Sequence, residues 1–404
     1  MWKLLSLALV AFGCGVSAES TNFASSPVFI PAFYLNNNPE VVQAGYTSPT
    51  QARDHWMRKG MQGGLQGTAA FHSRQYLQRY PDLAAKFGQN YTAAVEHYLT
   101  KGKTQGLLGY VEGGYEGRYT ISQGSLFISA STRVGGAVDS VVFDNTEFIN
   151  AWDHGRELQV AMTMLPNGEC FNPTEGGGRD DQRGAATTTK IQSISSQNGM
   201  LSTTVLPAFW LKPGDKETQD TGSNCTAGSP ALNTQDVYPY PFSKNITFGC
   251  PGADSDPCFT YSLSVVVGGS IPKYTTIQVE GPTGYHTGEF NTTKSLDVTT
   301  GALVDFDTSK PLVFSTWCLQ HAFGIWAPPG QDPDYSPSYA SMHFVQGQNF
   351  ADATQKWSVV WRTKAVSEDS LPMTLNYKVY ICVGTQIDAA KCTMKLFEHH
   401  NKTY

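Results

Sequence analysis

A tandem repeat over residues 29–109 limits what this chain can fold into, because it separates a repeated unit from everything that follows. The second copy lies 42 positions after the first without a gap. Identical residues recur at this offset: Phe29 and Phe71, Tyr34-Leu35 and Tyr76-Leu77, Pro39 and Pro81, His55 and His97, Lys59-Gly60 and Lys101-Gly102, Gly64-Leu65 and Gly106-Leu107. Such a match predicts a repeated supersecondary unit.

Each copy is predicted to contain two short helices. The first runs through the Tyr-Leu pair and ends before the Pro, and the second is amphipathic and ends at Lys-Gly, where Gly serves as the C-cap. In the second copy this helix is expected over Thr92–Thr100. One copy is too small to bury a core, so we expect the copies to stack on each other or on the next domain. His55 and His97 are expected to pack on a helix face rather than bind a ligand.

After a Gly-rich linker, residues 110–118, the pattern changes to short β-branched and aromatic runs separated by Gly, Pro, Asn and Asp. Strands are predicted over residues 125–130, 137–143, 158–164, 201–209, 259–267, 275–280, 312–317, 357–362 and 375–383. Because no helical segment lies between them, the fold is predicted to be mainly β. Residues 119–393 then form a large antiparallel β-sandwich or supersandwich, preceded by the small α-helical repeat region and followed by a C-terminal tail, residues 394–404.

The N-terminus has the pattern of a secretory signal. Lys3 lies in a short basic region, an apolar run over residues 4–12 is too short to span a bilayer, and a small-residue cleavage site ends at Ala18. Residues 19–28 are polar and are expected to form a flexible lead-in. No later run is long enough to span a membrane. Five glycosylation sequons occur, at Asn90, Asn224, Asn245, Asn291 and Asn401. A secreted, extracellular glycoprotein is expected.

The chain carries a formal net charge of −6, with 28 basic residues and no long basic run, which argues against a nucleic-acid partner. Eight cysteines are present, and Cys14 would leave with the signal. In an oxidising compartment most of the others should pair. The sequence-near candidates are Cys250 with Cys258 and Cys382 with Cys392; one of Cys170, Cys225 and Cys318 is left over. No CxxC pair occurs, and neither a metal nor a cofactor is expected.

The densest group of polar side chains lies between residues 150 and 178. Asp153, His154 and Arg156 surround Gly155. An arginine at this position is suited to binding a sugar carboxylate, and His154 to proton transfer. The alternative is a local ion pair that closes a loop between strands.

A Gly-rich loop follows directly. Glu169 and Glu175 are candidates for a carboxylate pair in glycosidic chemistry, and Asn172 for orienting a hydroxyl group. Cys170 in the same loop is more typical of a disulfide than of a nucleophile. The alternative is again a structural loop.

Two distant segments add further candidates. Tyr285 and His286 are a pair suited to β-elimination on uronic-acid polymers, or they occupy a Gly-rich turn that faces water. Trp326 near His321 is suited to stacking on a pyranose ring and equally to packing in a core. The predicted catalytic residues are thus His154, Glu169, Glu175 and His286, and the predicted substrate-binding residues are Asp153, Arg156, Asn172, Tyr285, His321 and Trp326.

These motifs carry resemblances. The segment from Gly135 resembles a family of largely uncharacterised secreted proteins with a Gly-Gly start, a DHGR motif and a GECxNPTE loop, here residues 135–136, 153–156 and 168–175. The opening is also similar to galactose-mutarotase-like β-supersandwiches, which implies a concave sheet face that meets carbohydrate. The repeats resemble the YLxxxPDL…HYxxxG modules of secreted surface proteins, although the closing EGR of those modules is replaced here by residues 64–66 and 106–108. This resemblance implies adhesion or spacing.

Two functional hypotheses follow. In the first, the β-sandwich engages glycans as a carbohydrate-active enzyme (a lyase, hydrolase or epimerase-like protein) on acidic polysaccharide. In the second, the chain is a non-catalytic matrix or surface-coat protein with adhesive repeats. Glycans or the extracellular matrix are the expected partners in both. The sequence contains no GxSxG, HExxH, P-loop or EF-hand motif, which argues against serine hydrolysis, zinc proteolysis and nucleotide chemistry.

Overall fold

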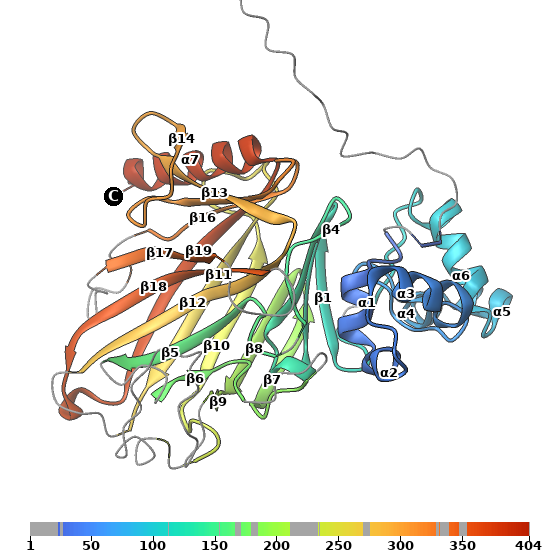
Figure 1. The fold of residues 1–404 in the computed structure, drawn as a ribbon, viewed down its shortest axis with the longest axis horizontal. Helices are drawn as coiled ribbons and strands as arrows, with labels where there is room; N and C mark the ends of the chain where they lie inside the picture. Colours follow the sequence, from blue (N-terminus) through green and yellow to red (C-terminus); the bar gives the residue numbers. More distant parts are fainter. Residues whose placement is uncertain are drawn as a thin grey trace, which may run out of the picture.

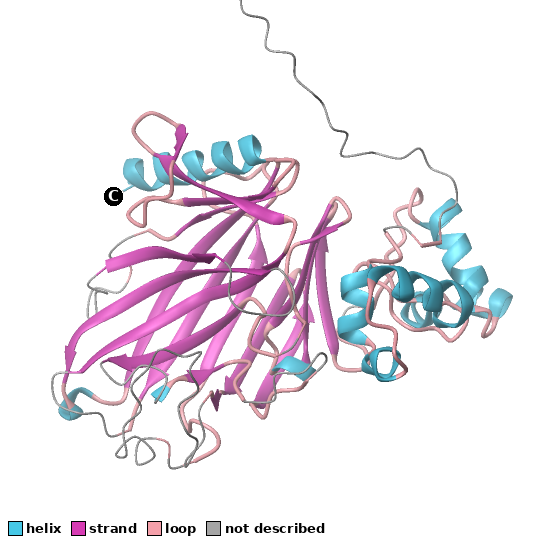
Figure 2. Ribbon diagram, in the orientation of Figure 1, coloured by secondary structure: helices cyan, strands magenta, loops and turns pink. Residues whose placement is uncertain are grey.

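The computed structural model describes residues 23–24, 27–111, 113–152, 154–165, 171–178, 185–210, 233, 235–269, 275–328, 331, 339–346 and 354–403. Short helices form the N-terminal part, strands form most of the remainder, and a helix ends the described chain (Figures 1 and 2). The predicted mainly-β fold with a small helical region before it is confirmed.

The two repeats have the same succession of elements. In the first copy these are α1 (Pro31–Asn37), α2 (Pro39–Gln43), α3 (Pro49–His55) and the π-helical turn η1 (Trp56–Gly60). In the second they are α4 (Ser73–Arg79), α5 (Pro81–Phe87), α6 (Tyr91–His97) and η2 (Tyr98–Gly102). The recurring Pro does end the first helix, and it also begins the next one, because proline's missing N–H is unneeded at the first helical position.

The recurring Tyr, His and Gly residues make the same contact in both copies. The hydroxyl of Tyr34 lies 2.7 Å from Nδ1 of His55, and that of Tyr76 lies 2.9 Å from Nδ1 of His97. A side chain on Gly60 would collide with the Tyr34 hydroxyl. The glycine is therefore needed for close packing, and both histidines lie on helix faces as expected.

Aromatic side chains from the two copies share one hydrophobic core, as stacked repeats require. Its largest fully buried members are Phe29, Tyr34, Trp56, Phe71 and Tyr76. The ring centroids of Phe29 and Trp56 are 5.4 Å apart, which is a favourable separation for an aromatic pair.

The strands of the C-terminal part are β1 (Arg118–Gln123), β2 (Leu126–Ser131), β3 (Val138–Phe143), β4 (Thr146–Glu147), β5 (Gln159–Leu165), β6 (Pro173–Thr174), β7 (Lys190–Gln197), β8 (Met200–Leu206), β9 (Ala208–Phe209), β10 (Phe242–Phe248), β11 (Cys258–Val267), β12 (Thr275–Thr287), β13 (Phe290–Asp297), β14 (Ala302–Val304), β15 (Leu312–Thr316), β16 (Ala322–Trp326), β17 (Tyr339–Gln346), β18 (Thr354–Val366) and β19 (Met373–Gly384). Short 3-10 turns are η3 (Thr132–Val134) and η6 (Glu368–Ser370).

Within the described residues these strands form three antiparallel sheets. The first has the order β1-β2-β3-β4, the second β14-β13-β15-β16-β19-β11-β10-β8-β7, and the third β17-β18-β12-β5-β6-β9. Side chains from all three sheets meet in one hydrophobic core, for example Ile128 of β2, Met162 of β5 and Tyr261 of β11. Burial alternates along β11, as expected for a strand with one face on that core.

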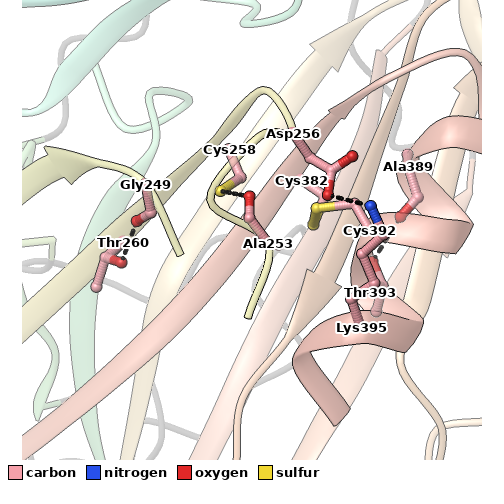
Figure 3. The surroundings of a disulfide bond; sticks show 10 residues. All are labelled: Gly249, Ala253, Asp256, Cys258, Thr260, Cys382, Ala389, Cys392, Thr393 and Lys395. Atoms are coloured by element: carbon pink, nitrogen blue, oxygen red, sulfur yellow. Dashed lines mark hydrogen bonds and ion pairs between the residues drawn. A yellow bond between two sulfur atoms is a disulfide. The ribbon is translucent and has the colours of Figure 1, made fainter. Parts of the chain in front are cut away.

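Helix α7 (Gln386–Thr403) covers part of the largest sheet and contacts β15, β16 and β19 (Figure 1). A disulfide joins Cys392 of this helix to Cys382 at the end of β19, which confirms that predicted pair. Figure 3 shows Cys258 close to this disulfide. Cys250 and Cys258 are neighbouring buried thiols rather than the predicted second disulfide.

The expected C-terminal tail differs from the structure, since residues 394–403 form the second half of α7. Leu396 of this half is buried in the cluster around the disulfide. The other departures are strands that the sequence analysis missed, such as β7 and β13. Both strands are rich in polar residues, and most of their positions are partly buried or exposed. Their hydrophobic periodicity is therefore weak.

The sequon asparagines that the structure describes, Asn90, Asn245, Asn291 and Asn401, are all exposed. Asn90 also forms the N-cap of α6, where its Oδ1 accepts a hydrogen bond from the N–H of Ala93 at 3.1 Å. Asn224 and the predicted signal sequence lie outside the described residues. No described helix is long and apolar enough to cross a membrane.

Candidate functional site

The polar segment predicted from the sequence closes on itself through a network of hydrogen bonds. Nδ1 of His154 lies 2.7 Å from the carbonyl oxygen of Gly176. The N–H of Gly176 donates to the side chain of Gln159 at 2.8 Å, and the N–H of Gly155 donates to Glu157 at 2.8 Å. Gly155 has a φ of +93°, which favours glycine at this corner. The two loops flanking β5 and β6 are therefore tied together by their own side chains.

Glu175 forms a buried ion pair with Lys244, a residue of β10 that the sequence analysis did not single out. Nζ of Lys244 also donates to the carbonyl oxygen of Gly136 at 2.6 Å, and the Thr203 hydroxyl lies 3.4 Å from the paired oxygen of Glu175. Burial lowers the pKa of Lys244 well below its usual range. A signal was available in the sequence: the strand FSKNITF alternates, which places the lysine among inward-facing residues.

His154 and its neighbours are enclosed rather than open to a ligand. The His154 side chain is buried, with its ring centroid 5.9 Å from that of Trp210. The guanidinium of Arg156 lies 5.0 Å from the ring of Trp152. Asn172, also buried, accepts a hydrogen bond from the N–H of Trp210 at 3.2 Å. The predicted residues Asp153 and Glu169 lie outside the described residues.

The segment around Tyr285 does lie beside the polar loops, as part of β12 rather than as a turn. The N–H of Asn150 donates to the carbonyl of Tyr285 at 2.7 Å, and the N–H of Tyr285 donates to the carbonyl of Arg156 at 2.9 Å. The Tyr285 ring is partly exposed, with Nζ of Lys356 at 5.8 Å from its centroid. The Tyr285 side chain is thus less buried than its neighbour His286.

His286 lies in the sandwich core. Its side chain is fully buried, Nδ1 is 2.6 Å from the carbonyl oxygen of Phe148, and Nε2 accepts a hydrogen bond from the indole of Trp357. Burial lowers the pKa of His286 to about 3, so the ring is neutral at physiological pH. This predicted catalytic residue therefore has a structural role, because both of its ring nitrogens form hydrogen bonds that join β12 to neighbouring segments.

The two remaining candidates lie apart from the polar loops. His321 is half-buried, and its Nε2 lies 3.1 Å from the hydroxyl of Thr146. Trp326 packs against α7 and its disulfide cluster, with the ring centroid of Tyr380 at 6.1 Å and that of His400 at 5.3 Å. In the described part of the chain, neither side chain has a hydrogen bond or ring contact with the His154–Glu175 network.

A cleft that sequence reasoning missed lies where the helical repeats meet the first sheet. Its volume is about 290 Å³, and residues from both repeats, the linker and η3 line it. The polar lining includes Asn37, Asn38, Gln66, His72, Arg74, Tyr115, Glu116, Thr132 and Arg133. No spacing in the sequence could have indicated it, because its walls come from the repeats, the predicted linker and the first sheet, which the sequence alone does not place together.

Arg118 holds the two walls of this cleft together. Its guanidinium makes two hydrogen bonds of 2.8 Å to Asp139 of β3 and one of 2.8 Å to Ser129 of β2. The same group bonds the side chain of Asn37 in α1 and lies 4.8 Å from the ring of Phe33. Because a paired guanidinium with this many partners is rigid, the repeat is fixed against the sheet.

No group of three or more His, Cys, Asp or Glu side chains within the described ranges is arranged to hold a metal ion. The polar network is built from hydrogen bonds and one buried ion pair, whereas the cleft is lined by neutral polar side chains, arginines and the carboxylates of Glu40 and Glu116. Within the described residues, the cleft is a cavity that a ligand could enter.

No family model matches the sequence, and a search of curated proteins finds no match. Among solved structures, the chain is similar to a heparan sulfate lyase from Pedobacter heparinus, at 10% identity and a TM-score of 0.40 over 83% of this chain and 47% of that one. A 4-alpha-glucanotransferase from Thermococcus litoralis matches at 8% identity and a TM-score of 0.34, over 87% of this chain and 55% of that one. A galactose 1-epimerase from Lactobacillus acidophilus matches at 10% identity and a TM-score of 0.32, over 66% of this chain and 93% of that one. The chain spans about half the length of the lyase.

Proposed function

We propose that this protein is a secreted glycoprotein that binds glycans without catalysis, through the cleft between its helical repeats and its β-sandwich. The observation that carries this proposal is the cleft itself, with its volume of about 290 Å³ and its mixed lining of amide, hydroxyl, imidazole, carboxylate and guanidinium groups. Neighbouring hydroxyls of a sugar need donors and acceptors at close spacing, and Asn and Gln side chains supply both.

The positions of the candidate catalytic side chains favour binding over catalysis. Glu175 is held by Lys244, and His286 is enclosed in the core with both ring nitrogens engaged. A general acid or base must come within hydrogen-bond reach of the substrate proton. Buried groups that already bond to the protein do not meet that condition.

Secretion and glycosylation are part of the same proposal. They rest on the signal-like pattern of the first 18 residues and on the sequons, whose described asparagines are all exposed. The repeats would then act in adhesion, because they supply one wall of the cleft.

A glycan array on the purified protein, followed by calorimetry on the bound glycans, tests the proposal. Thr132 is exposed and lines the cleft, so Thr132→Trp should fill it and lower the affinity at least about tenfold, a loss of ~1.4 kcal/mol. The matched control is Thr299→Trp, which changes an exposed threonine on the β13–β14 turn and should leave binding unchanged. Equal affinity of the two variants for a bound glycan would reject the cleft as the binding site.

A second candidate, a carbohydrate-active enzyme on acidic polysaccharide, is favoured by one observation. Nε2 of His154 and Oε2 of Glu175 are both buried and have no hydrogen-bond partner in the described part of the chain. His154 bonds to the residue next to Glu175, so the two unsatisfied atoms belong to one network. Release of reducing ends or of unsaturated products from uronate polymers, abolished by His154→Gln in a folded variant, would establish this activity and displace the binding proposal.

A further inference from the structure

We propose that the cleft selects an anionic group on its glycan, a carboxylate or a sulfate ester, and that the carboxylate of Glu116 occupies the position of that group until the glycan displaces it. This inference rests on the proposed glycan binding and adds its substrate class and an internal competitor.

Two arginines in the cleft have a positive charge that the described carboxylates neutralise weakly or not at all. Arg133 donates to the carbonyl oxygens of Ala185 at 2.7 Å and Ala151 at 3.5 Å, and no described carboxylate neutralises it. Arg74 donates to the carbonyl of Gly63 at 2.9 Å, and its nearest carboxylate is Glu116, with Nη1 and Oε1 separated by 3.6 Å. That separation is an ion pair without a hydrogen bond. By contrast, Arg118 is neutralised by its two hydrogen bonds to Asp139 and has a structural role.

Unsatisfied polar atoms gather in the same cleft. Nε of Arg74, Nε of Arg133 and Oγ of Ser131 are buried and have no hydrogen-bond partner within the described residues. Buried donors are bonded in most native proteins, so each such atom calls for an explanation. Two guanidinium groups and a hydroxyl are the donors that carboxylate and sulfate oxygens accept from.

The backbone conformation at Glu116 is unfavourable for a glutamate, which indicates that this side chain has a function at this position. Tyr115 and Arg118 exchange two backbone hydrogen bonds, of 2.8 and 2.9 Å, across a two-residue turn. Both central residues have positive φ, +48° at Glu116 and +81° at Gly117. Such turns prefer Asn, Asp or Gly at the first central position, and a glutamate there costs energy locally. A local rule broken at a cleft position is typical of a functional constraint.

Glu116 is nevertheless held by exposed contacts, namely the ion pair with Arg74 and an interaction with the side chain of Tyr115. Its side chain is 55% exposed and that of Arg74 is 38% exposed. His72 lies 4.0 Å from the second carboxylate oxygen, but burial lowers the pKa of His72 to about 3, so this ring adds no charge at neutral pH. Exposed ion pairs contribute about 0–1 kcal/mol. A glycan anion that bonds to Arg74 directly can therefore replace this carboxylate at little cost.

A comparison of the two repeats supports a specific role for these residues. Many positions that carry the repeat fold are identical in both copies, although Tyr98 stands in place of the buried Trp56. His72 and Arg74, by contrast, correspond to Ile30 and Ala32 in the first copy. The charged and polar groups of the cleft are thus not required by the repeat fold. They occur in the copy that faces the linker turn of Glu116.

The test is titration calorimetry on the full-length protein at low ionic strength, with four probes: an oligogalacturonate, a sulfated dextran oligosaccharide, an unsulfated dextran oligosaccharide of the same length, and inorganic sulfate. Glu116→Gln should bind the anionic probes about two- to fivefold more tightly, since it removes a competitor worth up to ~1 kcal/mol. Arg74→Gln should weaken them about tenfold or more. The matched controls are Glu96→Gln and Arg58→Gln, which change exposed residues outside the cleft and should have no effect.

The outcomes separate this inference from the binding proposal. If the neutral oligosaccharide binds as tightly as the anionic ones and Thr132→Trp blocks it, glycan binding at the cleft stands and anion selection is wrong. If inorganic sulfate binds with the predicted response to Glu116→Gln and Arg74→Gln while no oligosaccharide binds, the anion site stands and the proposed function is wrong. Unchanged affinity in Glu116→Gln for every anionic probe overturns the role of Glu116, whichever probe binds.

Discussion

The buried ion pair between Lys244 and Glu175 gives the sharpest test of whether the polar segment is structural. We expect Glu175→Gln to destabilise the fold strongly, although the two side chains have almost the same shape. The lysine side chain is 1% exposed and the glutamate side chain 3% exposed, so neither charge is solvated. Replacing the carboxylate by an amide removes the negative charge that compensates the buried ammonium group, whose other hydrogen-bond partner is the neutral carbonyl of Gly136.

The size of the effect follows from desolvation. Removing one partner of a buried pair costs about 3–5 kcal/mol, because the remaining charge loses its compensation. Replacing both partners by apolar residues of similar volume is often neutral, since the desolvation cost of both ions disappears as well. The double variant Lys244→Met with Glu175→Leu should therefore recover most of the loss and come within about 1 kcal/mol of the natural protein.

Urea unfolding followed by tryptophan fluorescence measures these differences in the free energy of unfolding. The matched control is Lys294→Met, which breaks an ion pair with Asp305 whose side chains are 38% and 100% exposed; it should cost less than about 1 kcal/mol. A Glu175→Gln variant that stays within 1 kcal/mol of the natural protein, or a double variant no more stable than the single one, would refute the reasoning. If such a stable Glu175→Gln variant also lost turnover of a polysaccharide, the glutamate would be a catalytic residue.

Three further predictions concern other parts of the fold. Gly60→Ala should destabilise the repeats by about 1–3 kcal/mol, because the added methyl group collides with the Tyr34 hydroxyl. Thermal unfolding should show that adding Tyr34→Phe to this variant recovers part of the loss. If the effects of the two substitutions on stability simply add, the packing argument is contradicted. Cys392→Ser removes a disulfide that closes a sequence separation of 10 residues, which should cost about 2–3 kcal/mol and speed hydrogen exchange in α7; unchanged exchange would contradict it. His286 has its pKa lowered to about 3, so the unfolded chain binds one more proton below its ordinary pKa of about 6.5. Stability should then fall by about 1.4 kcal/mol per pH unit as pH drops from about 6.5 toward 3, and His286→Gln should remove that part of the slope in urea titrations at several pH values.

The features predictable from the sequence were those with a strong local pattern. The repeat showed itself through identical residues at one offset, and the central strands through apolar alternation, as in β11 and β19. The disulfide of Cys382 was predictable because its partner is near in sequence. Helix α7 was missed because it begins directly after a strand, and its buried side faces a sheet that the sequence alone does not place.

The site was harder to predict, because a polar motif looks the same whether it binds a ligand or supports the fold. His154, Glu175 and Asn172 were correctly expected in loops, yet the structure uses them to join those loops. The decisive partner, Lys244, is 69 residues from Glu175. Pairings over such distances depend on strand order, which a single sequence does not reveal.

The predicted linker is the element whose role the structure changes most. The Tyr110 hydroxyl bonds that of Ser122 at 2.7 Å, the N–H of Val111 donates to Gln75 at 2.9 Å, and the N–H of Gly113 donates to Ser196 at 2.9 Å. A segment with these bonds fixes both ends of the junction, and the clamp of Arg118 follows directly after it. A cleft between two loosely tethered parts would have to order itself on binding, at a cost in affinity. Here the walls are already held, so in the proposed function the repeats and the sandwich act as one binding surface that does not have to order itself on binding.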